Sequence, residues 1–329
     1  MSAPQIVVVA GPTATGKTRL GILLARTYGG EIVSADSMQI YRRMDIGTAK
    51  ATPEERSEAP HHMLDVAEPR ENYSVSRYVE EAARCCEDIL ARGKLPILVG
   101  GTGLYIDSLL SGRDFAGRGE DDEDLRAELG ARYDAEGGEA LLRELASFDP
   151  ERAAKLHPSD RRRIVRAIEI YRLTGETISE HDRRTRALPP RYEAAHIHLN
   201  YRSRADLYAR IDARVDAMVE AGLFEEVAAL LSEGVPPDCT AMQAIGYKES
   251  AAALRGEISR AEAVGQIKQN SRRYAKRQLT WFSRTPDALT LLWDGAPDFE
   301  RGLRVSTEFL ASRGLSYCTG PGRSGRRTL

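Results

Sequence analysis

The chain has 329 residues, more than one hydrophobic core requires, so we expect two compact units that need no disulfide or metal to fold. Hydrophobic residues make up 42% and charged residues 29%, which excludes collagen-like, disordered and coiled-coil proteins. The formal net charge of −2 argues against a protein that is positive over its whole surface. No apolar run approaches the roughly 20 residues of a membrane span, so we expect a cytoplasmic monomer with no membrane partner.

Basic residues are concentrated in two segments. Residues 155–214 hold 14 Lys and Arg against 8 Asp and Glu, and residues 268–284 hold six basic residues and no acidic one. An acidic segment at 120–124 offsets them, which predicts a dipolar surface with a positive area suited to a polyanion. A solvated surface without any partner is the alternative for either segment taken alone.

The first hundred residues predict alternating strands and helices. The apolar runs at 6–10 and 95–99 are typical of strands covered on both faces, and residues 31–36 predict a second short strand. Residues 17–28 and 75–92 carry apolar side chains at helical spacing, and the second of these helices stops at Gly93. This alternation predicts an α/β fold with a doubly wound parallel sheet.

The sequence becomes polar and rich in helix formers from about residue 115. We expect a helical insertion at 115–198, inside a discontinuous catalytic core of residues 1–114 and 199–316, and a disordered tail at 317–329. Within the insertion, Leu188-Pro189-Pro190 ends the last helix, and the next strand is expected at 196–200. Long helices are expected at 205–232 and 259–283.

A phosphate-binding motif follows the first predicted strand. The segment Gly11-Pro12-Thr13-Ala14-Thr15-Gly16-Lys17-Thr18 fits G-x-x-x-x-G-K-[ST] and opens a helix. Its glycines let the backbone wrap a phosphate, amides at the helix start point at it, Lys17 supplies charge, and the Thr18 hydroxyl can bind Mg²⁺. The expected fold is therefore an α/β, P-loop-type doubly wound parallel sheet with a helical insertion domain.

The loop by itself would indicate an ATPase, a GTPase or a small-molecule kinase. Such enzymes usually hold their metal with an aspartate at the end of a second apolar strand, but residues 95–99 lead into Gly100-Gly101-Thr102-Gly103. Asp65 is only a weak substitute. Asp36 is better placed, because the carboxyl ends of parallel strands form the rim of the site. It could act as a general base, or it could simply cap a turn.

Several segments, in order, resemble the tRNA dimethylallyltransferase family, also called isopentenyl-tRNA transferases. They are the phosphate loop, residues 34–41 (SADSMQIY), 44–50 (MDIGTAK), 60–62 (PHH), 99–105 (VGGTGLY), 157–160 (HPSD) with Arg163 and Arg166, Gly246-Tyr247, and 275–281 (AKRQLTW). The likeness spans about residues 5–285, and we see no departure at a position that the family uses for chemistry.

The resemblance implies transfer of a dimethylallyl group from dimethylallyl diphosphate to N6 of adenosine 37, in tRNAs that read codons beginning with U. It implies that Asp36 is the base, that Thr18 binds a Mg²⁺ cofactor, and that Thr102 helps hold the target nucleotide unless it is only a turn residue. Residues Thr13 to Thr18 would hold the diphosphate with Arg214, whose alternative is an ion pair with Asp212 or Asp216. A P-loop small-molecule kinase that uses ATP is the alternative function, and a non-enzymatic RNA-binding ATPase is a third.

The resemblance further implies a grip on the tRNA anticodon stem-loop, whose target base must leave its stack to react. The insertion would clamp the stem, and basic side chains would hold the backbone in a salt-sensitive way. The expected tRNA-binding residues are Asp36, Ser37, Met38, Gln39, Thr102, Arg126, Asp160, Arg161, Arg162, Arg163, Ile164, Arg166, Arg272, Arg273, Lys276 and Arg277.

Aromatic side chains lie among the basic residues of the second segment and could stack on unpaired bases. These are Tyr274, Trp281 and Phe282, although a tryptophan in such a helix more often belongs to the core. His196 and His198 lie on one face of a predicted strand, and we expect them to be packed or solvated rather than to bind a metal.

Overall fold

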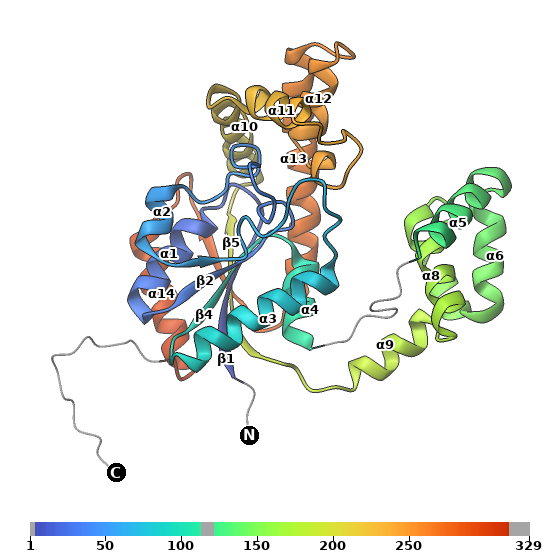
Figure 1. Cartoon of the computed structure of the whole chain (residues 1–329). Helices are drawn as coiled ribbons and strands as arrows, with labels where there is room; N and C mark the ends of the chain where they lie inside the picture. The colour runs from blue at the N-terminus through green and yellow to red at the C-terminus, as the bar shows by residue number, and fades with distance from the viewer. Residues whose placement is uncertain (1–3, 113–121, 316–329) are drawn as a thin grey trace. The chain divides into compact units, whose positions relative to one another are not determined.

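Six parallel strands form one sheet within residues 4–112 and 122–315, the part of the chain that this computed structural model describes (Figure 1). The strand order is β3-β2-β4-β1-β5-β6. The strands are β1 (Gln5–Ala10), β2 (Glu31–Ala35), β3 (His61–His62), β4 (Pro96–Gly100), β5 (Glu193–Tyr201) and β6 (Leu289–Trp293). The predicted α/β class with a parallel sheet is confirmed.

Helices cover both faces of the sheet, which explains why its central strands are apolar without alternation (Figure 1). On one face lie α1 (Lys17–Tyr28) and α14 (Phe299–Ser312), whose Leu20 and Leu310 are buried against side chains of β1, β4 and β5. On the other face lie α3 (Val75–Ala91) and the C-terminal part of α13 (Arg260–Phe282), where Phe282 packs against His198. Every residue of β2 and β4 is buried as a result.

Most predicted helices agree with the structure, with one correction. The helix expected at 259–283 is α13, which begins with a capping box between Ser259 and Glu262. The helix expected at 205–232 is instead two helices, α10 (Arg204–Glu220) and α11 (Leu223–Ser232). They are separated by Gly222, whose φ of 102° cannot belong to a continuous helix. Shorter elements are α2 (Pro53–Glu58), α4 (Gly103–Ser111), η1 (Ala241–Gln243) and α12 (Tyr247–Leu254).

A second compact unit spans Ser111–Arg191 and interrupts the sheet unit in sequence. Its helices are α5 (Glu123–Glu136), α6 (Gly138–Phe148), α7 (Pro150–Ala153), α8 (Arg161–Thr174) and α9 (Ile178–Arg186). Leu129, Leu141, Leu145, Ile164 and Ile168 form its core. This unit is helical, as the insertion was expected to be.

The boundaries of the insertion differ from those predicted. We expected it to extend to residue 198, but β5 begins at Glu193 and pairs with β1 from Gln5 to Ala10, so this stretch belongs to the sheet. The predicted start near residue 115 and the predicted tail at 317–329 lie outside the described residues. No helix of the described chain is both long and apolar enough to cross a bilayer.

Candidate active site

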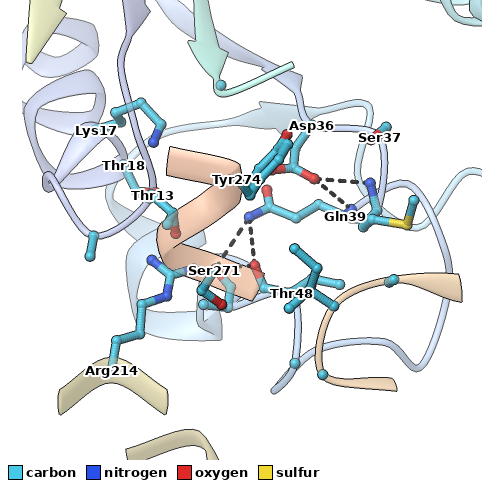
Figure 2. A pocket seen from close by; sticks show the side chains of 18 of the residues that line it. Thr13, Lys17, Thr18, Asp36, Ser37, Gln39, Thr48, Arg214, Ser271 and Tyr274 are labelled. Atoms are coloured by element: carbon cyan, nitrogen blue, oxygen red, sulfur yellow. Dashed lines mark hydrogen bonds between the residues drawn. The ribbon is translucent and has the colours of Figure 1, made fainter. Parts of the chain in front are cut away.

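A cavity of about 340 Å³ lies where β1, β2 and β4 end (Figure 2). The phosphate loop, the segment after β2, the loop after Met44, α10 and α13 all contribute to its wall. Figure 2 shows the phosphate loop, Arg214 and Asp36 around one space. The structure thus brings together these predicted site residues: Thr13, Ala14, Gly16, Lys17, Thr18, Asp36, Ser37, Met38, Gln39, Arg214 and Arg277.

Hydrogen bonds to two of its carbonyl groups stabilise the phosphate loop. The Thr15 hydroxyl and the Lys17 ammonium both donate to the Pro12 carbonyl, at 2.8 and 2.7 Å. The Tyr201 hydroxyl donates to the Ala14 carbonyl at 3.4 Å. At Gly11 the backbone of β5 is so close that a Cβ would lie 2.3 Å from the Leu199 carbonyl oxygen, which excludes any side chain there.

Two cations face the cavity without a fixed anion between them. Burial and, to a smaller extent, the charge of Arg214 together lower the pKa of Lys17 to about 7, against the opposing effect of Asp36. Burial also lowers the pKa of the Arg214 guanidinium, while Asp36 raises it. A bound anion between Lys17 and Arg214 would relieve their repulsion and their desolvation.

The surface ion pair considered for Arg214 is not formed. Asp212 binds Arg272 instead, and Asp216 binds Lys268 at 2.6 Å. Arg214 points toward the cavity and donates to the Thr48 carbonyl at 3.5 Å (Figure 2). Its guanidinium is therefore available to an anion on the phosphate loop.

Asp36 caps a turn with one carboxylate oxygen and leaves the other oxygen available for chemistry. Its Oδ1 accepts hydrogen bonds from the amides of Met38, at 2.9 Å, and Gln39, at 3.3 Å, and so caps the turn after β2. Its Oδ2 has no hydrogen-bond partner within the described residues. The carboxylate is thus fixed by one oxygen while the other can accept a proton.

Thr102 supports this turn from the end of the neighbouring strand. Its Oγ1 accepts a hydrogen bond from the Ser37 amide at 3.1 Å, and its own amide donates to the Ala35 carbonyl at 3.1 Å. Thr102 does not line the cavity, whereas Ser37 does. The side chain therefore holds the Asp36–Ser37 turn in place.

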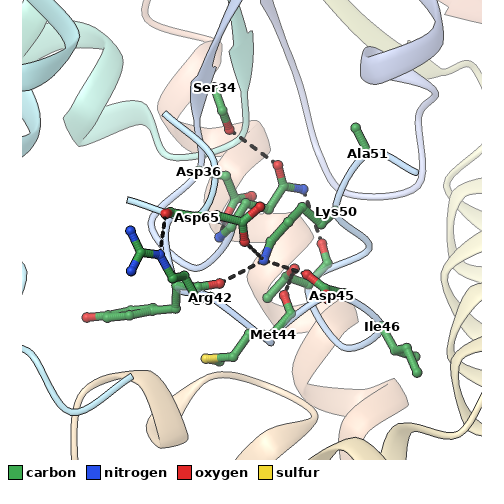
Figure 3. Close-up of polar contacts among 12 residues, drawn as sticks. Ser34, Asp36, Arg42, Met44, Asp45, Ile46, Lys50, Ala51 and Asp65 are labelled. Carbon is green, nitrogen blue, oxygen red and sulfur yellow. Dashed lines mark hydrogen bonds and ion pairs between the residues drawn. The ribbon is translucent and has the colours of Figure 1, made fainter. Parts of the chain in front are cut away.

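The loop from Met44 to Lys50 is fixed by a buried lysine (Figure 3). Lys50 donates to the Tyr41 carbonyl at 2.7 Å, to Asp45 at 2.6 Å and to Asp65 at 2.7 Å. Asp65 also binds Arg56 at 2.9 Å. Asp65 is thus part of this structural network, and the idea that it substitutes for a metal-binding strand aspartate has no support.

A carboxylate from α11 holds the other side of the same loop. Glu226 accepts hydrogen bonds from the amides of Asp45, Ile46 and Gly47, at 2.9, 2.8 and 3.1 Å, and from the Tyr247 hydroxyl at 2.5 Å. In the same loop, the Thr48 carbonyl accepts the hydrogen bond from Arg214. Glu226 therefore sets the position of a cavity wall from outside the cavity.

Two further positioning residues belong to quoted motifs: Gln39 was predicted to contact tRNA, and no role was predicted for Gln278. Gln278 is buried on α13, accepts a hydrogen bond from the Thr13 amide at 3.0 Å and donates to the Gly101 carbonyl at 2.9 Å. Gln39 donates to the carbonyls of Thr48 and Ala49, both at 3.2 Å. The motif offered a signal for these two residues, whereas Glu226 lies outside every motif that we identified.

The predicted tRNA-binding residues of the insertion differ in availability. Arg162 and Arg163 are exposed and form no ion pair within the described residues, whereas Arg161 binds Asp134 at 2.7 Å. Arg126 and Arg166 both bind the buried Glu169, and Asp160 accepts from the His157 amide. Ile164 is fully buried in the core of the unit, so its side chain is not available to tRNA.

The basic residues of α13 divide in the same way. Arg273 and Lys276 are exposed and lack an ion pair within the described chain, Arg272 binds Asp212, and Arg277 lies over the Tyr274 ring. Trp281 is 38% exposed rather than part of the core, and its indole donates to Asp107 at 2.9 Å. The exposed face of α13 thus combines cations with an aromatic ring.

His196 and His198 are packed, as expected. Their rings touch edge to face, and His198 is buried against Phe282. Burial lowers the pKa of each to about 4, so both are neutral near pH 7. The described residues contain no cluster of three potential His, Cys, Asp or Glu metal ligands.

The residues at the phosphate loop fit a metal that is held mainly by substrate. Thr18 lines the cavity, and its hydroxyl has no hydrogen-bond partner within the described part of the chain. Mg²⁺ keeps several waters and takes much of its coordination from substrate phosphates, and the Ser or Thr hydroxyl of a phosphate loop binds it there. The Thr18 hydroxyl beside the anion site fits that role.

Comparisons with known proteins agree on one family. The family model described as IPP transferase matches residues 39–285, and the model described as isopentenyl transferase matches residues 4–66. The tRNA dimethylallyltransferase of Thermoanaerobacter sp. (strain X514) is 49% identical over 284 residues, which are 85% of this chain and 89% of that protein. That of Geobacillus thermodenitrificans is 51% identical over 279 residues, 84% of this chain and 87% of that protein.

Solved structures give the same result. The tRNA isopentenylpyrophosphate transferase of Bacillus halodurans has a TM-score of 0.70 at 41% identity, covering 95% of this chain and 97% of that one. A eukaryotic dimethylallyltransferase acting on tRNA has a TM-score of 0.79 at 29% identity, covering 97% of this chain and 82% of that one.

Proposed function

The chain belongs to the IPP transferase family of tRNA dimethylallyltransferases, and from this premise we propose that it transfers a dimethylallyl group to tRNA. The donor is dimethylallyl diphosphate, and the acceptor is N6 of adenosine 37 in tRNAs that read codons beginning with U. One observation carries the proposal: the two cations of the phosphate site and the uncommitted oxygen of Asp36 face the same cavity. A leaving anion and an acceptor proton each have a site there.

The leaving group needs the stronger stabilisation, because the adenine amine is a weak nucleophile whose lone pair is delocalised into the ring. In the reaction the bond from N6 to C1 of the prenyl group forms. The bond from C1 to the diphosphate oxygen breaks, and its electron pair stays on the diphosphate. Lys17 and Arg214 neutralise that charge as it develops. Thr18 would hold a Mg²⁺ ion, which supplies further neutralisation of the diphosphate when bound.

Asp36 receives the proton. Its Oδ1 is fixed by two backbone amides, so Oδ2 is held at a constant position to accept the proton that N6 loses. Thr102 keeps the turn rigid through Ser37. The exposed cations Arg162 and Arg163 on α8, and Arg273 and Lys276 on α13, are the ones available to tRNA phosphates.

The kinase alternative is not favoured. After β4 the chain continues through Gly101 and Thr102 into α4, and no carboxylate follows the strand to hold a nucleotide-bound metal. The named relatives are tRNA dimethylallyltransferases.

The proposal is tested by incubating the protein with Mg²⁺, unmodified tRNA and dimethylallyl diphosphate labelled in its prenyl carbons. We expect label to enter tRNA, and to be absent from a tRNA with guanosine in place of adenosine 37. A parallel reaction contains ATP labelled at its γ-phosphate. Phosphoryl transfer from ATP without prenyl transfer would refute the proposal and support the kinase.

A further inference from the structure

The phosphate loop is also contacted by a segment from the far end of the sequence. Strand β6 and helix α14 follow residue 285, where the match to the IPP transferase family model ends. The last residue of β6 is Trp293, which is 1% exposed and does not line the cavity. Its indole Nε1 donates a hydrogen bond to the carbonyl oxygen of Thr15 at 2.9 Å. This contact joins two regions that are 278 residues apart.

The hydrogen bond fixes the direction of an amide in the loop. A trans peptide group is planar, so the Thr15 carbonyl and the Gly16 amide belong to one unit and point in opposite directions. The hydrogen bond from the buried Trp293 directs the Thr15 carbonyl toward the protein interior. The Gly16 amide must then point away from Trp293, and Gly16 lines the cavity.

The next helix restrains the same peptide group. Gly16 has a φ of 82°, and the ring of Phe299, the first residue of α14, occupies the space where a Cβ would stand, at 2.7 Å. Phe299 and Trp293 also contact each other edge to face, with ring centroids 5.9 Å apart. The Thr15–Gly16 peptide is thus restrained by two aromatic rings, the Trp293 indole at the Thr15 carbonyl and the Phe299 ring at Gly16.

We propose that Trp293 is a positioning residue of the phosphate site, whose indole N–H aims the Gly16 amide at the bound diphosphate. Without this donor the peptide group can rotate and turn the Thr15 carbonyl oxygen toward the anion, which replaces an attraction with a repulsion. The inference rests on the proposed diphosphate site, and it assigns part of that site to the segment beyond residue 285.

The test compares Trp293→Phe, which keeps an aromatic ring but removes the donor, with Leu310→Ala. Leu310 is fully buried on α14 and makes no side-chain hydrogen bond, so this control loosens the same packing without touching the Thr15 carbonyl. The probe is inorganic pyrophosphate, titrated calorimetrically against the full chain. We expect Trp293→Phe to weaken binding about tenfold, the effect of losing an oriented donor to a charged group, and Leu310→Ala to leave it nearly unchanged. Equal losses in the two variants at equal thermal destabilisation would overturn the proposal.

Steady-state kinetics give a second discrimination. In Trp293→Phe the KM for dimethylallyl diphosphate should rise by a similar factor, while the KM for tRNA stays constant. A rise in both KM values together would indicate a general loss of structure and contradict the assignment.

A measurement on a protein with its phosphate loop intact keeps the proposal testable if Trp293→Phe does not fold. The chain has two tryptophans, so Trp281→Phe leaves Trp293 as the only indole. Its N–H signal in a ¹⁵N spectrum should exchange slowly with solvent and shift when pyrophosphate is added. Rapid exchange, or no shift at saturating pyrophosphate, would overturn the proposal. Because pyrophosphate replaces the prenyl donor here, a chain that passes these tests but fails to prenylate tRNA would refute the proposed function alone.

Discussion

Asp36 combines two roles that could be regarded as alternatives. One carboxylate oxygen caps a turn and the other is uncommitted, so a substitution can separate structure from chemistry. Asp36→Asn retains an oxygen for the amides of Met38 and Gln39 but removes the base. We expect the single-turnover rate of prenyl transfer to fall by about 10²-fold or more, with tRNA and pyrophosphate binding preserved. A rate near that of the unmodified protein would remove Asp36 from the mechanism.

Lys17 makes diphosphate binding dependent on pH. In the free protein its pKa is lowered to about 7, so above pH 7 it is mostly neutral, whereas a bound diphosphate favours its charged form. Binding must then take up a proton, and affinity should fall by up to about tenfold per pH unit between pH 7.5 and 9.5. The ligand for this measurement is dimethylallyl diphosphate, whose last ionisation lies at a pH of about 6 and so does not interfere in this range.

Calorimetry in buffers of different ionisation enthalpy measures this proton uptake. Lys17→Arg is the matched control, because an arginine stays charged throughout the range and should abolish the uptake. Affinity of the unmodified protein that does not change with pH would show that Lys17 is already charged before binding.

At the scale of elements, the loop from Met44 to Lys50 depends on α11. Glu226 accepts hydrogen bonds from three backbone amides and from the Tyr247 hydroxyl. Glu226→Gln should therefore reduce the free energy of unfolding by about 2 kcal/mol. The KM for dimethylallyl diphosphate should also rise, because Arg214 contacts the Thr48 carbonyl of this loop. Glu225→Gln is the control, since Glu225 is exposed on the same helix. An unchanged KM in Glu226→Gln would show that the loop does not need this anchor.

Strand β5 makes the fold sensitive to acid. The folded pKa of His198 is about 4, below its ordinary value of 6.5, so the unfolded chain binds more protons in that interval. The contribution of His198 to stability should be constant above pH 6.5 and should decrease as the pH falls toward 4. His198→Phe should remove about 2 kcal/mol of the loss between pH 7 and 4.5, measured by urea unfolding. Identical pH dependence in the variant and the parent would assign the acid sensitivity to other groups.

At the scale of the whole molecule, the parts of the fold that follow local rules were predictable. β1, β2 and β4 are buried on both faces, and most of their residues are therefore apolar. Strands β3 and β6 lie at the two edges of the sheet and were not identified: β3 has only two residues, and β6 is only partly buried. The division between α10 and α11 depends on one glycine, Gly222, inside an otherwise helical sequence.

The site was predictable where its residues are adjacent in sequence. The phosphate loop and Asp36 each follow a buried strand, so a motif and a topological rule suffice to find them. Gln278, Glu226 and Trp293 reach the site from distant positions, and no periodicity in the sequence marks such tertiary contacts. Ile164 shows the opposite error, since its basic neighbours suggested a surface although its spacing to Ile168 places it in the core.

The central claim is that this chain attaches a dimethylallyl group to tRNA, and the nucleosides of cellular tRNA test it most directly. The full-length chain, and separately its Asp36→Asn variant, would be expressed in a bacterium whose own tRNA dimethylallyltransferase gene has been deleted. Bulk tRNA would then be digested and analysed by mass spectrometry. We predict that N6-(dimethylallyl)adenosine appears with the unmodified chain and is nearly absent with the variant. Its absence when the unmodified chain is present and folded would contradict the account.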